Sequence, residues 1–299
     1  MEDFLYISLD KDQKDMELGI SKIVQENQKN LENLFLITAE VGLLYPNHML
    51  KEFEARGLGF LIEEEHVNLE TSLREASNHF LRSLVVYLYT TDQTNTADQF
   101  INCMLRMLRK AIDVNTKDMD KNTAIRTAEG CLYFFEKALS EVKTQYDFTN
   151  VLAELNLSEN YPEMVVYRIF GFLEELVSTV PFISDPVHQV IHTYVARYLE
   201  SHGQPVVKLA AMQALVTIVG SSKTTVLQKV NMAVFFTQFE AMMRDHFDKT
   251  NENYLLLFGN LLFKLVKALE SHLSAYLDKV FSAIVFMSDS FCQGKRFLD

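Results

Sequence analysis

The stretch "GQPVVKLAAMQALVTIVG", residues 203–220, decides how the rest of the chain is interpreted. One set of its apolar residues recurs at the spacing of a single helix face: Val207, Ala210, Ala211, Ala214, Leu215 and Ile218. A second apolar stripe follows about a third of a turn away and consists of Leu209, Met212 and Val216. A helix that is apolar on two sides is buried between neighbours on both sides. The stretch therefore predicts a buried helix and not a strand.

The residues at the start of this stretch indicate where the helix begins. Gly203 suits the end of a preceding helix, because glycine readily adopts the backbone conformation found there. Pro205 suits the first turn of the next helix, where a backbone N–H has no partner within the helix. The whole chain has only 10 Gly and 5 Pro in 299 residues. So few helix breakers, among many long apolar-periodic segments, predict an all-α protein.

The segment "PVVKLAAMQAL" resembles the second helix of a HEAT-type repeat, in which a proline precedes a pattern of Val-Arg, Ala-Ala and Ala-Leu. In this chain the pattern is filled by Pro205, Val207, Lys208, Ala210, Ala211, Ala214 and Leu215. The pattern recurs in "LREASNHFL" from Leu73 and in "IRTAEGCLY" from Ile125, where Glu129 stands in place of the second alanine. Fainter copies begin at residues 31, 165 and 254.

The six copies are separated by 42, 52, 40, 42 and 47 residues. HEAT and armadillo units are about 40–47 residues long, so the longer spacing indicates an insertion, which we place in the polar residues 92–99. The resemblance implies an α-solenoid of about six helical hairpins that forms one domain over residues 1–299. It also implies that a basic residue near the start of a second helix pairs with an aspartate six positions earlier, which Asp120 and Arg126 fit.

Composition limits the function classes. The net charge of −12 and the lack of a basic stripe make nucleic-acid binding a poor fit. Cys103, Cys131 and Cys292 lie far apart and form no CxxC pair, so we expect free, mostly buried thiols in a reducing compartment. The N-terminus does not have the pattern of a signal peptide, and the richest apolar run is too short to span a bilayer. We expect an intracellular protein, cytoplasmic or nuclear, with no membrane insertion.

Motifs that would indicate catalysis are incomplete. In "HQVIH", His188 and His192 share a helix face and could hold zinc, but Gln189 stands where a metalloprotease has its glutamate base. The segment "ALVTIVGSSKTT" lacks both glycines of a phosphate-binding loop, since Thr217 and Ser222 occupy those positions. The pair of glycines in "GLGF" from Gly57 follows no predicted strand. The sequence therefore predicts no enzyme activity, no cofactor and no small-molecule substrate.

The function that remains is a protein–protein interaction scaffold. Stacked helical repeats build a concave surface, and the second helices would present Arg74, Arg126 and Lys208 near it. A further basic cluster, Arg106, Arg109 and Lys110, could contact an acidic partner. Two alternatives stay open: a nuclear-transport-receptor-like solenoid fragment, and a helical metal-binding protein that uses His188 and His192.

The last predicted helix, "SHLSAYLDKVFSAIVFMSDSF", has an apolar stripe wider than packing on one preceding helix needs. A terminal repeat needs a polar outer face, because no neighbour covers it. We therefore expect that the chain belongs to a longer solenoid or pairs with another chain here. The residues expected at that assembly surface are Tyr276, Leu277, Val280 and Ile284.

Overall fold

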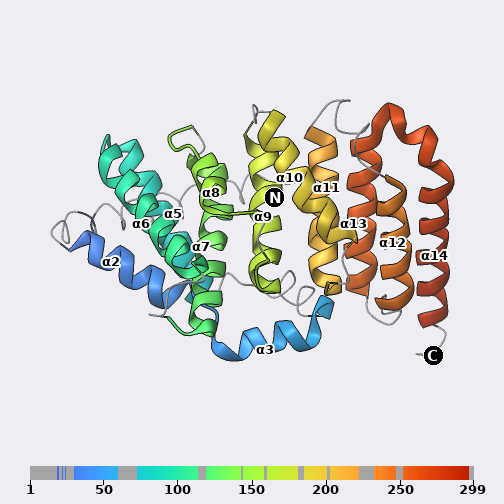
Figure 1. Cartoon of the computed structure of the whole chain (residues 1–299), viewed down its shortest axis with the longest axis horizontal. Coiled ribbons are helices and arrows are strands. Elements are labelled where there is room, and N and C mark those ends of the chain that lie inside the picture. The colour runs from blue at the N-terminus through green and yellow to red at the C-terminus, as the bar shows by residue number, and fades with distance from the viewer. Residues whose placement is uncertain are drawn as a thin grey trace, which may run out of the picture. The chain divides into compact units, whose positions relative to one another are not determined.

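The computed structural model describes residues 30–59, 73–113, 119–142, 144–157, 160–180, 185–200, 203–221, 232–246 and 252–295, together with Gly19, Lys22 and Val24. Every regular element within these ranges is a helix, which confirms the all-α prediction (Figure 1). The chain divides into two compact units. Unit 1 comprises Met1–Asn47 and Asn68–Leu155, and unit 2 comprises His48–Val67 and Asn156–Asp299. The chain therefore passes into unit 2, returns to unit 1, and passes into unit 2 again.

Unit 1 is built around two long parallel helices. Its helical elements are α2 (Leu31–Ile37), the π-helical turn η1 (Thr38–Gly42), α5 (Leu73–Thr90), α6 (Thr94–Ile112), α7 (Lys121–Val142) and α8 (Thr149–Glu154). Arg74, early in α5, contacts Glu129 of α7, and Arg82, further along α5, contacts Glu141 near the end of α7. Contacts in this order mean that α5 and α7 run in the same direction. Helix α6 connects them and packs against both.

Aromatic side chains join the short N-terminal helix to this core. Phe35 of α2 is fully buried and stacks on Phe100 of α6, with ring centroids 4.5 Å apart. Its edge meets Phe134 of α7, with centroids 6.3 Å apart. Burial of a phenylalanine side chain contributes about 2 kcal/mol or more, so α2 is held mainly by apolar packing.

Two glycines let the chain after α2 lie close against α5 and α7. A Cβ atom at Gly42 would overlap the hydroxyl of Ser77 on α5. At Gly130 of α7, a Cβ atom would lie 3.3 Å from the carbonyl oxygen of Leu43. At both glycines the backbone lies so close to a neighbouring segment that a larger residue would push the two apart. The segment from Gly42 to Tyr45 is thus docked on both long helices of unit 1.

Unit 2 has two sets of helices. Its elements are α3 (Asn47–Arg56, of which Asn47 falls in unit 1), α9 (Glu163–Thr179), α10 (Asp185–Glu200), α11 (Pro205–Ser221), α12 (Met232–His246), α13 (Glu252–Leu269), the 3-10 segment η3 (Glu270–Tyr276) and α14 (Leu277–Lys295). Helix α11 lies between α9 and α13, while α12 packs with α10 and α14 (Figure 1). Helices α9, α11 and α13 thus form one layer of unit 2, and α10, α12 and α14 form the second layer.

The first layer of unit 2 is parallel, and polar contacts fix its register. The backbone N–H of Gln204, just before α11, donates to the Glu163 carboxylate at the start of α9, at 3.1 Å. At the other end, Glu174 of α9 accepts hydrogen bonds from Thr217 of α11 (3.1 Å) and Lys264 of α13 (3.2 Å). One carboxylate therefore links the exposed edges of three neighbouring helices.

Helix α11 confirms the prediction made from its sequence. It begins at Pro205, and both apolar stripes, from Val207 to Ile218, are buried. Ala211 and Ala214 have no exposed surface, because small side chains let the flanking helices approach closely. The helix is therefore buried between its neighbours, as a helix that is apolar on two sides requires.

Two boundaries predicted from the sequence are wrong. The polar residues 92–99 do not form an inserted loop: α6 begins at Thr94, and the turn between α5 and α6 is closed by Asp92 with a positive φ of 57°. The last helix begins at Leu277 and not at Ser271, since the residues before it form the 3-10 segment η3.

Helix α3 belongs to unit 2, although its neighbours along the chain, α2 and α5, belong to unit 1. Phe53 is buried, and its ring lies 5.9 Å from that of Tyr167 on α9. The side chain of Gln204 donates to the carbonyl oxygen of Glu54 at 3.5 Å. An early segment of the chain is thus packed against helices that follow much later.

Candidate interaction surfaces

Arg74, predicted to face a partner, lies inside unit 1. Its guanidinium donates to both carboxylate oxygens of Glu129, at 2.6 and 2.8 Å. The same group lies between two aromatic rings, 3.5 Å from the centroid of Tyr45 and 4.1 Å from that of Tyr133. Only 9% of Arg74 is exposed, and Glu129 is fully buried. This pair holds α5, α7 and the Tyr45 segment together, so Arg74 is not part of the surface proposed below.

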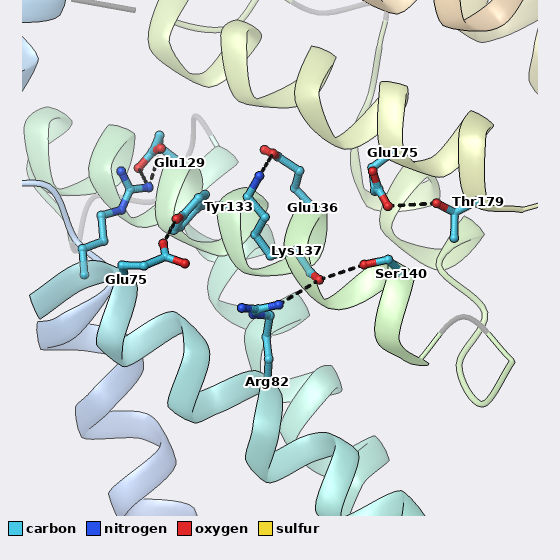
Figure 2. Close-up of polar contacts among 10 residues, drawn as sticks. Glu75, Arg82, Glu129, Tyr133, Glu136, Lys137, Ser140, Glu175 and Thr179 are labelled. Carbon is cyan, nitrogen blue, oxygen red and sulfur yellow. Dashed lines mark hydrogen bonds and ion pairs between the residues drawn. The ribbon is translucent and has the colours of Figure 1, made fainter. Parts of the chain in front are cut away.

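Further polar contacts follow the same two helices, and we call this line the α5–α7 seam (Figure 2). The hydroxyl of Tyr133 on α7 donates to Glu75 on α5. Arg82 forms an ion pair with Glu141 and donates to the carbonyl oxygen of Lys137 at 3.5 Å. Burial raises the pKa of Glu141, and the nearby Arg82 opposes that rise. Charge pairing therefore extends over more than two turns of each helix.

Asn78 lies on the same face of α5, between the Arg74 and Arg82 positions. It is fully buried, and neither its amide nitrogen nor its oxygen has a hydrogen-bond partner among the described residues. A buried amide without a partner costs about 1–3 kcal/mol, and native structures contain few of them. Among the described residues of the seam, Asn78 is thus the buried side chain whose polar atoms all lack a hydrogen-bond partner.

Arg126 is also used within unit 1. Its guanidinium donates to the carbonyl oxygen of Tyr45 at 3.0 Å, and the side chain is half-buried. Asp120, the predicted partner of Arg126, accepts from the backbone N–H groups of Asn122 and Thr123 and from the Thr123 hydroxyl. These hydrogen bonds, with a smaller contribution from Arg126, lower the pKa of Asp120. Asp120 therefore acts first as the N-terminal cap of α7.

Lys208 lies in unit 2 and is half-buried. Its ammonium group donates to the side-chain oxygen of Gln238 at 2.9 Å, so it connects α11 to α12. It thus points toward the second layer of helices. Arg74, Arg126 and Lys208 all have partners within their own units, and none of them is fully exposed.

The basic cluster on α6 is exposed. Arg109 is bound to Glu154 of α8, with one contact of 2.6 Å, and this hydrogen bond lowers the pKa of the Glu154 carboxyl. Arg106 and Lys110 are exposed and have no ion pair within the described residues. Two of the three predicted basic residues thus remain available to an acidic partner.

Among the described residues, the largest run of exposed apolar side chains on one helix is on α14. The exposed fractions are 39% for Leu277, 61% for Phe281, 43% for Ile284 and 56% for Val285. These four residues, at i, i+4, i+7 and i+8, share one face, which we call the outer face of α14. A second stripe, about a third of a turn away, carries Val280, Ala283 and Met287, which are buried. Helix α14 is therefore apolar on two sides but covered by described residues on only one.

Of the four residues predicted to form the assembly surface at this helix, two are exposed on the outer face and two are not. Leu277 and Ile284 lie on the outer face, as expected. Val280 is only 5% exposed and packs inward, and Tyr276 is half-buried with its ring 5.7 Å from that of Phe236. Phe281 and Val285 belong to the outer face, although the prediction did not include them. Both belong to the apolar stripe of the sequence, but which part of that stripe faces outward depends on the rotation of α14 about its axis.

One edge of the outer face is acidic. Asp278 and Asp289 are both exposed, and neither has an ion pair with a described residue. Eleven residues are about three helical turns, so the two carboxylates lie on the same side of α14, roughly 16 Å apart. Lys279, on the side of α14 that is turned away from the outer face, is bound to Glu240 of α12 at 3.3 Å.

The candidate metal motif lies on α10. His192 is half-buried, while the side chain of His188 falls outside the described residues. Among the residues that the structure describes, no group of three or more His, Cys, Asp or Glu side chains is placed to hold a metal ion. The cysteines are unpaired: Cys103 and Cys131 are buried and Cys292 is exposed. Burial raises the pKa of the Cys131 thiol, which keeps it protonated.

In the described part of the chain, no helix is long and apolar enough to cross a membrane. Comparison of the chain with family models, curated proteins and solved structures gives no match. Among the surfaces described above, the outer face of α14 is the most apolar.

Proposed function

We propose that this chain is a non-enzymatic scaffold of HEAT-like helical repeats that binds another protein, and that the outer face of α14 is its main binding surface. The observation that carries the proposal is the exposure of Leu277, Phe281, Ile284 and Val285 on one helix face. Single exposed apolar residues are common on proteins, whereas contiguous apolar patches mark interaction sites.

The arrangement of unit 2 supports the repeat part of the proposal. Helices α9, α11 and α13 pack side by side with α9 and α11 parallel, and α12 packs with α10 and α14. In an array of this kind each helix is covered by the next, so its last helix needs either a polar outer face or a further neighbour. The outer face of α14 is not polar, which favours a further neighbour.

The exposed pair Arg106 and Lys110 on α6 supports a second, smaller contact site for an acidic partner. The nuclear-transport and metal-binding alternatives stay predictions, because no described contact favours either of them.

The test compares the proteins retained by the wild-type chain with those retained by a variant of the outer face. Phe281→Glu places a charge at the most exposed apolar position of that face and should abolish the specific retention of partners from the native cell. Ser282→Glu, at the exposed neighbouring position, is the matched control and should retain them. Both variants should melt within about 2 °C of the wild type, because surface changes usually alter stability by less than about 0.5 kcal/mol. Equal retention by Phe281→Glu and wild type would disprove the proposed surface.

A further inference from the structure

We infer that the partner received by the outer face of α14 is an amphipathic helix with basic residues along one edge. The inference rests on the proposed function and adds the chemistry of the partner. It depends on three observations: the spacing of the exposed apolar residues, the acidic edge beside them, and the contrast between α14 and α11.

The spacing of the outer face favours a helix as the occupant. Leu277, Phe281, Ile284 and Val285 repeat at i, i+4, i+7 and i+8, the arrangement by which one helix packs its side chains between those of another. The inward side of α14, with Val280, Ala283 and Met287, repeats in the same way and packs within unit 2. The four outer residues span about 12 Å of the helix axis, or about two turns.

Helix α11 shows what covers such a helix elsewhere in unit 2. Like α14, it is apolar on two sides, and it is buried because α9 packs on one side and α13 on the other. Helix α14 packs against α12, α13 and η3, and among its described apolar residues only those on the Val280 side are buried. A helix in the remaining position would bury the outer face of α14 as α13 buries one side of α11.

The acidic edge determines which helix fits. Asp278 and Asp289 are exposed on the side of the outer face that carries Val285. A partner helix packed on this face would place its own edge beside both carboxylates. Lys or Arg residues about 11 positions apart on that edge would pair with both at once. A partner helix with acidic residues on that edge would instead be repelled by both carboxylates.

A second copy of this chain is a poorer occupant than such a basic helix. Each copy has a net charge of −12, which opposes association. An antiparallel pair of α14 helices would also bring the two acidic edges together, so that Asp278 of one copy faces Asp289 of the other. Charge complementarity therefore favours a partner with the opposite sign.

The experiment uses two synthetic peptides of 18 residues with the same Leu and Phe positions on one helix face. One peptide carries Lys and Arg along one edge, and the other carries Gln at those positions. Binding of each labelled peptide to the full chain is measured by fluorescence anisotropy at low and at moderate ionic strength. We expect the basic-edge peptide to bind about fivefold more tightly at low salt, and the difference to shrink as salt is added.

Variants of the protein separate the two parts of the interaction. Phe281→Glu should abolish the binding of both peptides. The double variant Asp278→Asn/Asp289→Asn should bind the Gln peptide as the wild type does, but lose the preference for the basic edge. A control with the same net charge, Glu32→Gln/Glu200→Gln, removes two exposed carboxylates from other helices and should keep the preference.

Cys292 reports where the peptide binds. It is the exposed cysteine, and it lies near the outer face about two turns beyond Val285. Bound peptide should therefore slow the reaction of Cys292 with a thiol reagent, whereas the buried Cys103 and Cys131 should react slowly throughout.

Three outcomes would overturn the inference. If Phe281→Glu abolishes binding but the Asn double variant keeps the basic-edge preference, the face is correct and the partner chemistry is wrong. If neither variant alters binding, the proposed function fails as well. If neither peptide binds, and light scattering shows a dimer that Phe281→Glu converts to a monomer, the occupant is a second copy of the chain.

Discussion

Helices α7 and α11 are both largely buried, but in different ways. Helix α11 is covered by α9 and α13 and buries only apolar side chains over most of its length. Helix α7 is packed against α5 and α6, yet it buries Glu129, whose charge is balanced by Arg74. An apolar helix gains stability from each buried residue separately, whereas a buried ion pair is stabilising only while both partners are present. The two units should therefore respond differently to the same kind of substitution.

The largest effect is expected from a charge placed in α11. Ala211 has no exposed surface, so Ala211→Asp buries a carboxylate without a partner and should lower the free energy of unfolding by about 4 kcal/mol. Lys208→Ala on the same helix removes one hydrogen bond to Gln238 and should cost about 1 kcal/mol. Urea denaturation measures both. Equal stability of Ala211→Asp and wild type would mean that this side of α11 is not packed.

A somewhat smaller effect is expected when the buried pair of α7 is broken. Glu129→Leu leaves the Arg74 charge without its carboxylate and should lower the free energy of unfolding by about 3 kcal/mol, with the rings of Tyr45 and Tyr133 still in contact. Adding Arg74→Met to that variant removes the unpaired charge and should restore most of the loss. A double variant no more stable than Glu129→Leu alone would show that the pair is not the cause.

The smallest effect should have the opposite sign. Asn78 is buried in the α5–α7 seam, with both polar atoms of its side chain lacking a described partner. Asn78→Leu keeps a similar volume and removes the desolvated amide, so we expect a gain of up to about 1 kcal/mol by urea denaturation. Asn78→Asp, which adds a charge at the same position, should be destabilising. A clear loss of stability in Asn78→Leu would indicate that the amide has a partner, such as a buried water.

The contrast between the two helices also explains how far the sequence alone could lead. The apolar periodicity of residues 203–220 predicts α11 correctly, from its start at Pro205 to the burial of Ala211, because apolar burial depends mainly on the pattern of one helix. The recurrence of the pattern likewise predicts the positions of α5, α7, α9 and α13.

The α5–α7 seam could not be predicted in this way. In the sequence, Glu129 is a departure from the repeat pattern and Arg74 a candidate for partner binding, and nothing local connects the two. The structure pairs them across 55 positions. An acidic and a basic residue in apolar surroundings at similar positions of successive repeats are a usable signal for such a pair.

The α14 surface was predicted in part. The width of its apolar stripe indicates correctly that one apolar side of the helix is not covered, because a helix packed on a single neighbour needs only one apolar face. The individual residues depend on the rotation of the helix about its axis. That rotation is set by how Val280 and Met287 pack inward, which the stripe alone does not determine.

The position of α3 has a consequence for synthesis on the ribosome. Glu54 and Gln204, which are hydrogen-bonded in unit 2, are 150 residues apart in sequence. At a translation rate of about 5–20 residues per second, α3 emerges roughly 8–30 seconds before α11 exists to receive it. During that time the residues of unit 1 that flank α3 on both sides can already assemble. The buried ring of Phe53 must meanwhile stay exposed or be held by a chaperone, so a nascent chain stalled near Leu155 should bind chaperones through α3.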